Sequence, residues 1–126
     1  MEKTIRIISK KVGEKPVRQD MEHTLENMQK KVGGYLEVVR FPLGIDMWVN
    51  DEGLINGLPL NLVILKGGKV ISHICGDVFF ASADEEGETI GLNPAQVHWI
   101  RNNTQFVGIA KGKDELDYLV YGINID

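Results

Sequence analysis

The sequence predicts an α+β fold with a mostly antiparallel β-sheet and two short α-helices. Short β-branched or apolar segments alternate with turn residues along the chain, and two segments repeat apolar residues at helical spacing. Hydrophobic residues make up 43% and charged residues 25% of the chain, which excludes a disordered chain, a collagen and a coiled coil. We expect residues 1–126 to form a single domain, since 126 residues can bury one hydrophobic core.

The first two expected elements are strands. Residues 4–9 (TIRIIS) are rich in β-branched side chains, which predicts a strand. Residues 13–16 begin with glycine and end with proline, which predicts a turn. A short return strand is expected to begin at Val17, so the chain opens with a strand–turn–strand unit.

A helix is expected after this unit. Leu25, Met28 and Val32 are spaced i, i+3 and i+7, so they lie on one face of a helix. Thr24 is the expected N-cap residue. Gly33 suits the left-handed conformation that follows a helix, so we expect the helix to end there.

A hairpin follows the helix. Residues 35–41 and 45–50 predict two strands joined by the loop of residues 42–44. Both faces of this hairpin carry apolar side chains, so we expect it to be central in its sheet and covered on both sides. A three-residue loop fixes which residues face each other. The expected pairs are Phe41 with Ile45, Arg40 with Asp46, Val39 with Met47, and Val38 with Trp48.

The middle of the chain alternates turns with short strands, because glycine, proline and asparagine clusters separate its apolar runs. The expected elements, in order, are a turn at 50–53, an irregular corner at 57–61, a strand at 62–65, a tight connection at 66–69, and strands at 70–74 and 77–81 with a kink between them.

The clearest start signal in the chain precedes a second helix. Asn93 is the expected N-cap, Pro94 occupies the first helical position, and Gln96 completes a variant of the capping box. Two closing strands are then expected, at residues 105–110 and 118–125. The second of these segments also fits the start of a helix, because its apolar residues match either period.

Four short motifs occur in an order that resembles a known family. They are Gly-Gly-Tyr at 33–35, Asn-Asp-Glu-Gly at 50–53, Gly-Leu-Pro-Leu-Asn at 57–61 and Val-Phe-Phe at 78–80. Their combination resembles domain of unknown function 3846, an uncharacterised family common in bacteriophages and mobile elements. The resemblance covers about residues 4–100, and residues 103–126 form a strand extension beyond it. Members often carry an arginine directly after the corner asparagine, where this chain has Leu62.

The resemblance implies a phage-like origin and a small intracellular domain, and it brings no established activity. Small phage proteins of this kind are made inside an infected bacterium, so the implied location is the host bacterial cytoplasm. Many of them act against host defences, which favours an anti-defence role. A site that depends on the arginine of relatives is not expected at Leu62 in this chain.

The charge balance excludes several classes of partner. Lysine and arginine total 14 against 18 aspartate and glutamate residues, which gives a net charge of −4. Proteins that bind the backbone of nucleic acids usually carry a basic stripe, so we expect no nucleic-acid partner. The longest apolar run, residues 62–65, is too short to span a bilayer, and the N-terminus lacks an apolar signal-peptide core. We therefore expect no membrane partner and a cytoplasmic location.

The residue pattern contains no recognisable catalytic or metal-binding set. The three histidines, His23, His73 and His98, lack helical metal-ligand spacing. His73 and Cys75 lie two residues apart and could form a nucleophile with its base, or simply a buried thiol beside a half-exposed histidine. Phosphate-binding loops and hydrolase motifs do not occur. We expect a protein that is not an enzyme and has no catalytic residue, metal or cofactor.

A set of aromatic, amide, cationic and glycine residues forms the candidate ligand site. Aromatic faces can stack on a base, amides can bind its polar edge, and glycine N–H groups beside lysines can hold a phosphate. Each group also has a structural explanation, namely core packing for the aromatics, turn geometry for the asparagines and a plain hairpin for the glycines. The candidates are Tyr35, Trp48, Asn50, Asn61, Lys66, Gly67, Gly68, Trp99 and Arg101.

Two functions are compatible with these residues. The first is a non-enzymatic protein that sequesters a nucleotide-type molecule, specifically a cyclic nucleotide immune signal, to counter host defence. The alternative is an inhibitor or adaptor of a host protein, which requires an exposed apolar patch on residues 103–126, with Tyr118, Val120 and Tyr121. In that case, truncation of residues 103–126 leaves a folded core. We expect a homo-oligomer, since short chains with several strands often cover their sheet edges by dimerising.

Overall fold

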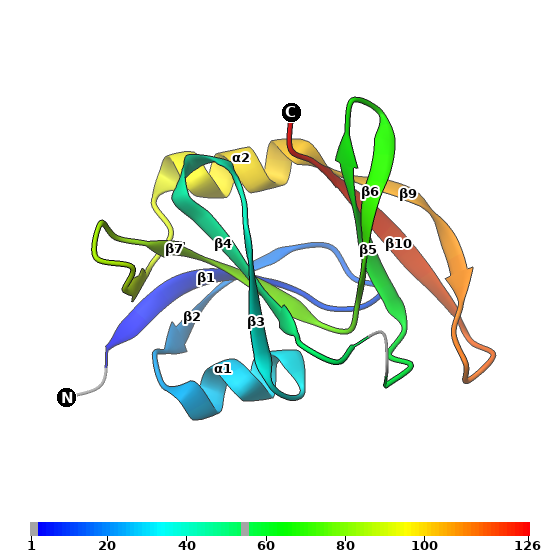
Figure 1. Cartoon of the computed structure of the whole chain (residues 1–126), viewed down its shortest axis with the longest axis horizontal. Helices are drawn as coiled ribbons and strands as arrows, with labels where there is room; N and C mark the ends of the chain where they lie inside the picture. Colours follow the sequence, from blue (N-terminus) through cyan, green and yellow to red (C-terminus); the bar gives the residue numbers. More distant parts are fainter. Residues whose placement is uncertain (1–2, 54–55) are drawn as a thin grey trace.

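The fold is α+β, with two α-helices and two mostly antiparallel sheets (Figure 1). The computed structural model describes residues 3–53 and 56–126, so predictions for Met1, Glu2, Leu54 and Ile55 lie outside the described residues. None of the described helices is long and apolar enough to cross a membrane. In chain order, the elements are β1 (Thr4–Lys10), β2 (Val17–Glu22), α1 (Leu25–Val32), β3 (Leu36–Arg40), the 3-10 turn η1 (Pro42–Gly44), β4 (Ile45–Asn50), β5 (Leu60–Lys66), β6 (Lys69–Cys75), β7 (Val78–Ala83), β8 (Thr89–Ile90), α2 (Pro94–Asn103), β9 (Thr104–Lys111) and β10 (Asp117–Asn124).

The two sheets have different topologies. The first sheet has the strand order β2-β1-β7-β4-β3, with β8 paired to β7, and all of its pairs are antiparallel. The second sheet has the order β6-β5-β10-β9. Its central pair, β5 with β10, is parallel, whereas the outer pairs are antiparallel. The last strand of the chain is thereby inserted into the middle of the second sheet.

The first sheet is covered on both faces. Helix α1 packs on one face, where Met28 and Val32 join Ile7 and Phe79 in one core cluster. The other face packs against the second sheet and α2 in a larger cluster. In Figure 1, α1 lies below the first sheet, α2 lies above it and the second sheet stands at the right. The larger cluster consists of Ile8, Phe41, Ile45, Met47, Val49, Leu62, Ile64, Ile74, Val78, Phe80, Leu92, Val97, Ile100 and Ile123.

Both predicted helix starts are confirmed. The Thr24 hydroxyl accepts a hydrogen bond from the Asn27 N–H, at 3.1 Å, and Gly33 ends α1 in the left-handed conformation, at φ 77°. The Asn93 side chain accepts from the Gln96 N–H at 2.8 Å, and the Gln96 side chain accepts from the Asn93 N–H at 2.9 Å. This reciprocal pair satisfies two helix-terminal donors and fixes where α2 begins.

The predicted register of the β3–β4 hairpin is confirmed, including the pairs of Val38 with Trp48 and Arg40 with Asp46. The prediction that the whole hairpin is central is wrong. Strand β4 lies between β7 and β3, but β3 is the edge of the first sheet. The side chains of Glu37 and Arg40 on β3 are exposed, as suits an edge strand.

The closing segment predicted at residues 118–125 is a strand over Asp117–Asn124, which resolves the alternative of a helix start. The expectation that Val120 and Tyr121 form an exposed patch is wrong, because β10 is flanked by strands on both sides; their side chains are only 4% and 8% exposed. Tyr118 is half-buried. The exposed apolar side chains of residues 103–126 are instead Phe106, Val107, Ile109, Leu116 and Leu119.

Candidate functional site

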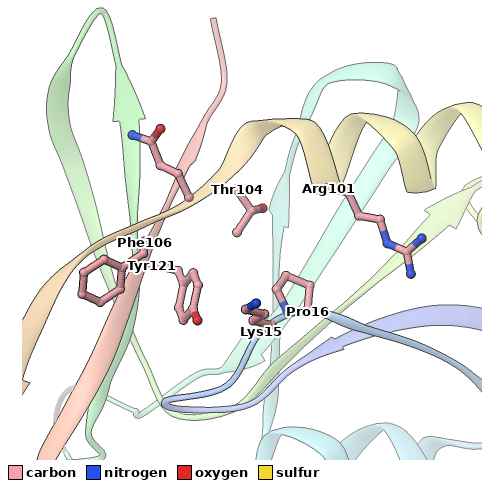
Figure 2. A pocket seen from close by; sticks show the side chains of 7 residues that line it. Lys15, Pro16, Arg101, Thr104, Phe106 and Tyr121 are labelled. Atoms are coloured by element: carbon pink, nitrogen blue, oxygen red, sulfur yellow. The ribbon is translucent and has the colours of Figure 1, made fainter.

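A surface cleft of about 380 Å³ lies where three separate parts of the chain meet. The β1–β2 loop, the C-terminal end of α2 and the strands β9 and β10 contribute its walls (Figure 2). This volume is within the range of small-molecule sites, about 300–1,000 Å³. The lining residues are Lys15, Pro16, Arg101, Thr104, Gln105, Phe106 and Tyr121.

The junction of α2 and β9 supplies four of the lining residues. Helix α2 ends at Asn103 and β9 begins at Thr104, with no loop between them. The Thr104 hydroxyl donates to the Ile100 carbonyl at 2.7 Å, and the Asn103 side chain donates to the Trp99 carbonyl at 2.8 Å. These bonds satisfy carbonyls that the helix end would otherwise leave without a donor. The side chains at the junction are therefore carried by a well-fixed backbone.

Two aromatic rings form one wall of the cleft. Phe106 on β9 is paired in register with Tyr121 on β10, and their ring centroids lie 6.1 Å apart at an interplanar angle of 80°. This is the edge-to-face arrangement that aromatic pairs favour. Tyr121 is buried, whereas Phe106 is 55% exposed. The Phe106 ring is thus held by a buried neighbour while much of its surface remains open for stacking.

The charged residues that line the cleft are both cations. Lys15 and Arg101 contribute to its surface, and none of the lining residues is an aspartate or a glutamate. Among the described residues, neither Lys15 nor Arg101 takes part in an ion pair. In Figure 2, the two rings lie on one side of the cleft and the Arg101 side chain on the other. The cleft therefore offers unpaired positive charge beside an aromatic surface, on a chain with net charge −4.

A third cation, Lys10, lies next to Tyr121. Its ammonium nitrogen is 4.6 Å from the centroid of the Tyr121 ring, and its side chain is 0% exposed. The ammonium donates to the Asn61 side-chain oxygen at 2.5 Å and to the Lys11 carbonyl at 3.0 Å. Burial lowers the pKa of Lys10 to about 8, although Asp77 and Glu14 partly oppose the shift. At neutral pH the amine is still mainly protonated, so it adds positive charge close to the cleft.

The lowered pKa of Lys10 predicts that stability rises with pH. The native state loses this proton at about pH 8, and the unfolded state near the ordinary value of 10.5. Between these values the unfolded state binds more protons, so the free energy of unfolding increases as pH rises. We expect an increase of roughly 1–2 kcal/mol between about pH 7.5 and about pH 9.5, measured by urea unfolding. Lys10→Met should remove this increase, and a flat profile in the wild-type protein would contradict the assignment.

The two predicted asparagines have structural roles. The Asn50 amide donates to the Val32 carbonyl at 3.1 Å, and its oxygen accepts from the Glu52 N–H at 2.8 Å. Asn61 is 0% exposed and donates to the carbonyls of Lys10 and Gly76. Asn50 also lines a hollow of about 200 Å³, but both amides are engaged by the protein's own groups. Turn geometry accounts for the local bond between Asn50 and the Glu52 N–H, whereas the bonds of Asn61 join segments that are far apart in the chain.

The three predicted aromatics lie at separate places. Tyr35 is 70% exposed, between α1 and β3. Trp48 stacks on Phe79, with ring centroids 6.4 Å apart, and packs against the core cluster between α1 and the first sheet. Trp99 lies edge-to-face with Phe41, with ring centroids 6.2 Å apart, and packs against the larger core cluster. These three residues do not line the cleft.

The glycine pair lies at the β5–β6 turn, distant in sequence from the cleft residues. Gly67 and Gly68 both have positive φ, 58° and 78°, and Lys66 is paired with Lys69 at the strand ends. The Gly67 N–H donates to the Asp126 carboxylate at 2.6 Å. A carboxylate of the chain itself therefore uses the N–H group proposed for a phosphate.

The nine predicted ligand-binding residues all lie in the described part of the chain. Arg101 lines the cleft, and the other eight do not.

His73 and Cys75 both lie on β6 and line the same small hollow. Burial raises the pKa of the Cys75 thiol above its ordinary value, which disfavours the reactive thiolate. Within residues 3–53 and 56–126, no group of three or more His, Cys, Asp or Glu side chains could hold a metal ion. The geometry gives no support to a nucleophile–base pair at these two residues.

Sequence reasoning missed most of the cleft. The sequence pattern does not single out Lys15, Thr104, Gln105 or Phe106, because each is ordinary in its local context, and it assigns Tyr121 to a possible protein-binding patch instead. The usable signal is a cluster of ligand-binding groups at the end of the second helix. A cation, a hydroxyl, an amide and an aromatic ring lie within six consecutive residues there, at Arg101, Thr104, Gln105 and Phe106. Tyr121 becomes part of this set only through the pairing of β9 with β10.

Comparison with curated proteins found no match, and comparison with solved structures found none either. A family model described as "Domain of unknown function (DUF3846)" matches residues 5–105. The match includes Lys15, Pro16, Arg101, Thr104 and Gln105 of the cleft, whereas Phe106 and Tyr121 lie beyond it. Because the match covers most of the 126 residues, the chain belongs to the family of domain of unknown function 3846.

Proposed function

We propose that this protein binds a nucleotide-type small molecule in the cleft at the α2–β9 junction and sequesters it without altering it. One observation carries the proposal. One cleft of about 380 Å³ is lined by an exposed aromatic ring, a side-chain amide, a hydroxyl group and two cations that form no ion pair with the part of the chain that the structure describes. A base, a sugar and a phosphate require these types of partner.

Each part of such a ligand has a partner in the cleft. A base can stack on the exposed face of Phe106, which Tyr121 holds from the side. The Gln105 amide both donates and accepts, so it can bind the polar edge of a base. Arg101 can bind a phosphate through two parallel N–H groups, and Lys15 adds a second charge. Among the lining residues there is no carboxylate, histidine or cysteine, which favours binding over catalysis.

The proposed biological setting is infection of a bacterium. In this setting the protein is of phage or mobile-element origin, acts in the host cytoplasm, and captures a cyclic nucleotide immune signal so that host defence is not activated. The support for this setting is the resemblance to a family common in bacteriophages and mobile elements. The support for a nucleotide-type ligand is independent of it, because that inference comes from the chemistry of the cleft.

Titration of AMP and GMP into the full chain tests the role of the cleft. Phe106→Ala removes the stacking surface, and base–aromatic stacking contributes about 1–3 kcal/mol, so we expect affinity to fall about tenfold. Arg101→Gln should have an effect of similar size on the phosphate-bearing ligands. The matched control is Lys69→Gln, which removes one exposed positive charge from the β5–β6 turn, outside the lining of the cleft. Equal affinities for the wild type and Phe106→Ala would contradict the proposed site.

A protein partner is the second candidate function, and the exposed apolar residues of β9 favour it. Val107 and Ile109 are 44% and 64% exposed on a strand at the edge of the second sheet. An edge strand offers unpaired backbone groups to another chain, which also supports the proposed homo-oligomer. Ile109→Lys separates the two candidates. It should abolish association through this edge and leave AMP affinity unchanged, because Ile109 does not line the cleft.

A further inference from the structure

A second hollow, of about 200 Å³, adjoins the cleft at Arg101. It is lined by Arg6, Arg18, Pro94, Val97, His98 and Arg101. The chain has four arginines, and three of them meet here, although the net charge of the chain is −4. We refer to Arg6, Arg18 and Arg101 with His98 as the arginine hollow.

The fold brings these arginines together from three elements. Arg6 is on β1 and Arg18 is on β2, and Arg18 is paired in register with Ile8. Alternate strand residues share a face, so Arg6 lies on the same face as Ile8, which is buried in the core cluster that includes α2. On α2, Val97, His98 and Arg101 lie at positions i, i+1 and i+4 and line the same hollow as Arg6 and Arg18.

None of the three guanidinium groups forms a salt bridge with a carboxylate of the described residues. Asp20 is the register partner of Arg6 but does not come within ion-pair distance of it and does not line the hollow. By contrast, the fourth arginine, Arg40, pairs with Asp46 at 3.2 Å. Like charges gathered in one hollow repel one another, and a bound polyvalent anion relieves that repulsion.

We propose that the arginine hollow binds a phosphoryl group of the same ligand whose base occupies the cleft. Arg101 lines both sites, so it can contact phosphates on either side of it. The proposal rests on the proposed function for the position of the base, and it narrows the ligand to nucleotides with at least two phosphoryl groups. The phosphate site itself depends only on the arginines.

Titration calorimetry of the full chain with inorganic pyrophosphate, adenosine, AMP and ADP tests this site. We expect ADP to bind at least about tenfold more tightly than AMP, because a second phosphate gains charge-assisted hydrogen bonds. Arg6→Gln and Arg18→Gln should each weaken ADP and pyrophosphate binding about tenfold and leave adenosine binding unchanged. Lys69→Gln, with the same loss of charge, should change none of these affinities. Arg6 and Arg18 are exposed, so both variants should fold, as thermal unfolding can verify.

The outcomes separate the two proposals. If pyrophosphate binds and the arginine variants weaken its binding, but adenosine and AMP do not bind, the phosphate site in the arginine hollow is supported and the proposed nucleotide function is wrong. If AMP binds, ADP binds no more tightly than AMP and the arginine variants have no effect, the phosphate site in the arginine hollow is wrong and nucleotide binding in the cleft is supported. Tighter binding of a short single-stranded DNA than of ADP, lost in the same variants, would overturn the small-molecule assignment.

Discussion

Removal of residues 104–126 should leave a chain that does not fold. These residues form β9 and β10, and β10 is the inner neighbour of β5 in the second sheet. Without β10, the pairs of Leu62 with Tyr121 and Ile64 with Ile123 are lost, and the buried side chains of Leu62 and Ile64 become exposed to water. The loss should exceed the total stability of a typical domain, about 5–15 kcal/mol.

Circular dichroism and urea unfolding of the truncated chain measure this result. The expected outcome is a spectrum without the native strand signal and no cooperative transition. Deletion of Asp126 alone is the control, because it leaves β9 and β10 in place and removes the hydrogen bond that the Asp126 carboxylate accepts from the Gly67 N–H. A cooperative transition in the truncated chain would show that the second sheet forms without β10. It would also restore the hypothesis that residues 103–126 are a detachable extension for a protein partner.

Asn61→Ala should destabilise the native state by about 3–5 kcal/mol, the range for breaking a buried network around a charge. Asn61 makes three hydrogen bonds at a position that is 0% exposed. Its oxygen accepts from the Lys10 ammonium, and its amide donates to the carbonyls of Lys10 and Gly76, both at 2.8 Å. Alanine would leave both carbonyls without this donor and remove one of the two acceptors of the buried ammonium.

Urea unfolding of Asn61→Ala and Asn102→Ala measures this effect against a matched change. Asn102 is exposed and bonds only to the His98 ring, so its replacement should change stability by less than about 0.5 kcal/mol. A loss below about 1 kcal/mol for Asn61→Ala would mean that water or another group replaces the bonds of Asn61. In that case, the Lys10–Asn61 pair would not be a determinant of the fold.

The local parts of the fold could be predicted from the sequence, because their causes are local. The caps at Thr24 and Asn93 depend on residues within one helical turn. The register of the β3–β4 hairpin follows from the length of its loop. The parallel pairing of β5 with β10 joins residues about sixty positions apart, and no periodicity within either segment encodes it.

The candidate site was less predictable from the sequence, because its residues come together only through contacts between distant segments. Aromatic side chains are large and apolar, so Trp48 and Trp99 are packed against the cores, where burial stabilises them most. Phe106 is exposed at the cleft because β9 is an edge strand that extends beyond the core. Arg6, Arg18 and Arg101 come from distant segments, and their proximity depends on the packing of α2 on the face of the first sheet that carries Ile8. Residue type alone therefore identified Arg101 but not its partners.

Native mass spectrometry of the full chain, incubated with a panel of cyclic mono-, di- and trinucleotides, shows whether the protein sequesters such a ligand. It reports the oligomeric state, the mass of any bound ligand and the number of ligands for each chain. The predicted result is a stoichiometric adduct that is weakened in Phe106→Ala and whose ligand is recovered with unchanged mass after denaturation. Unbound protein throughout the panel, or recovery of a ligand of altered mass, would contradict sequestration of a nucleotide in the cleft.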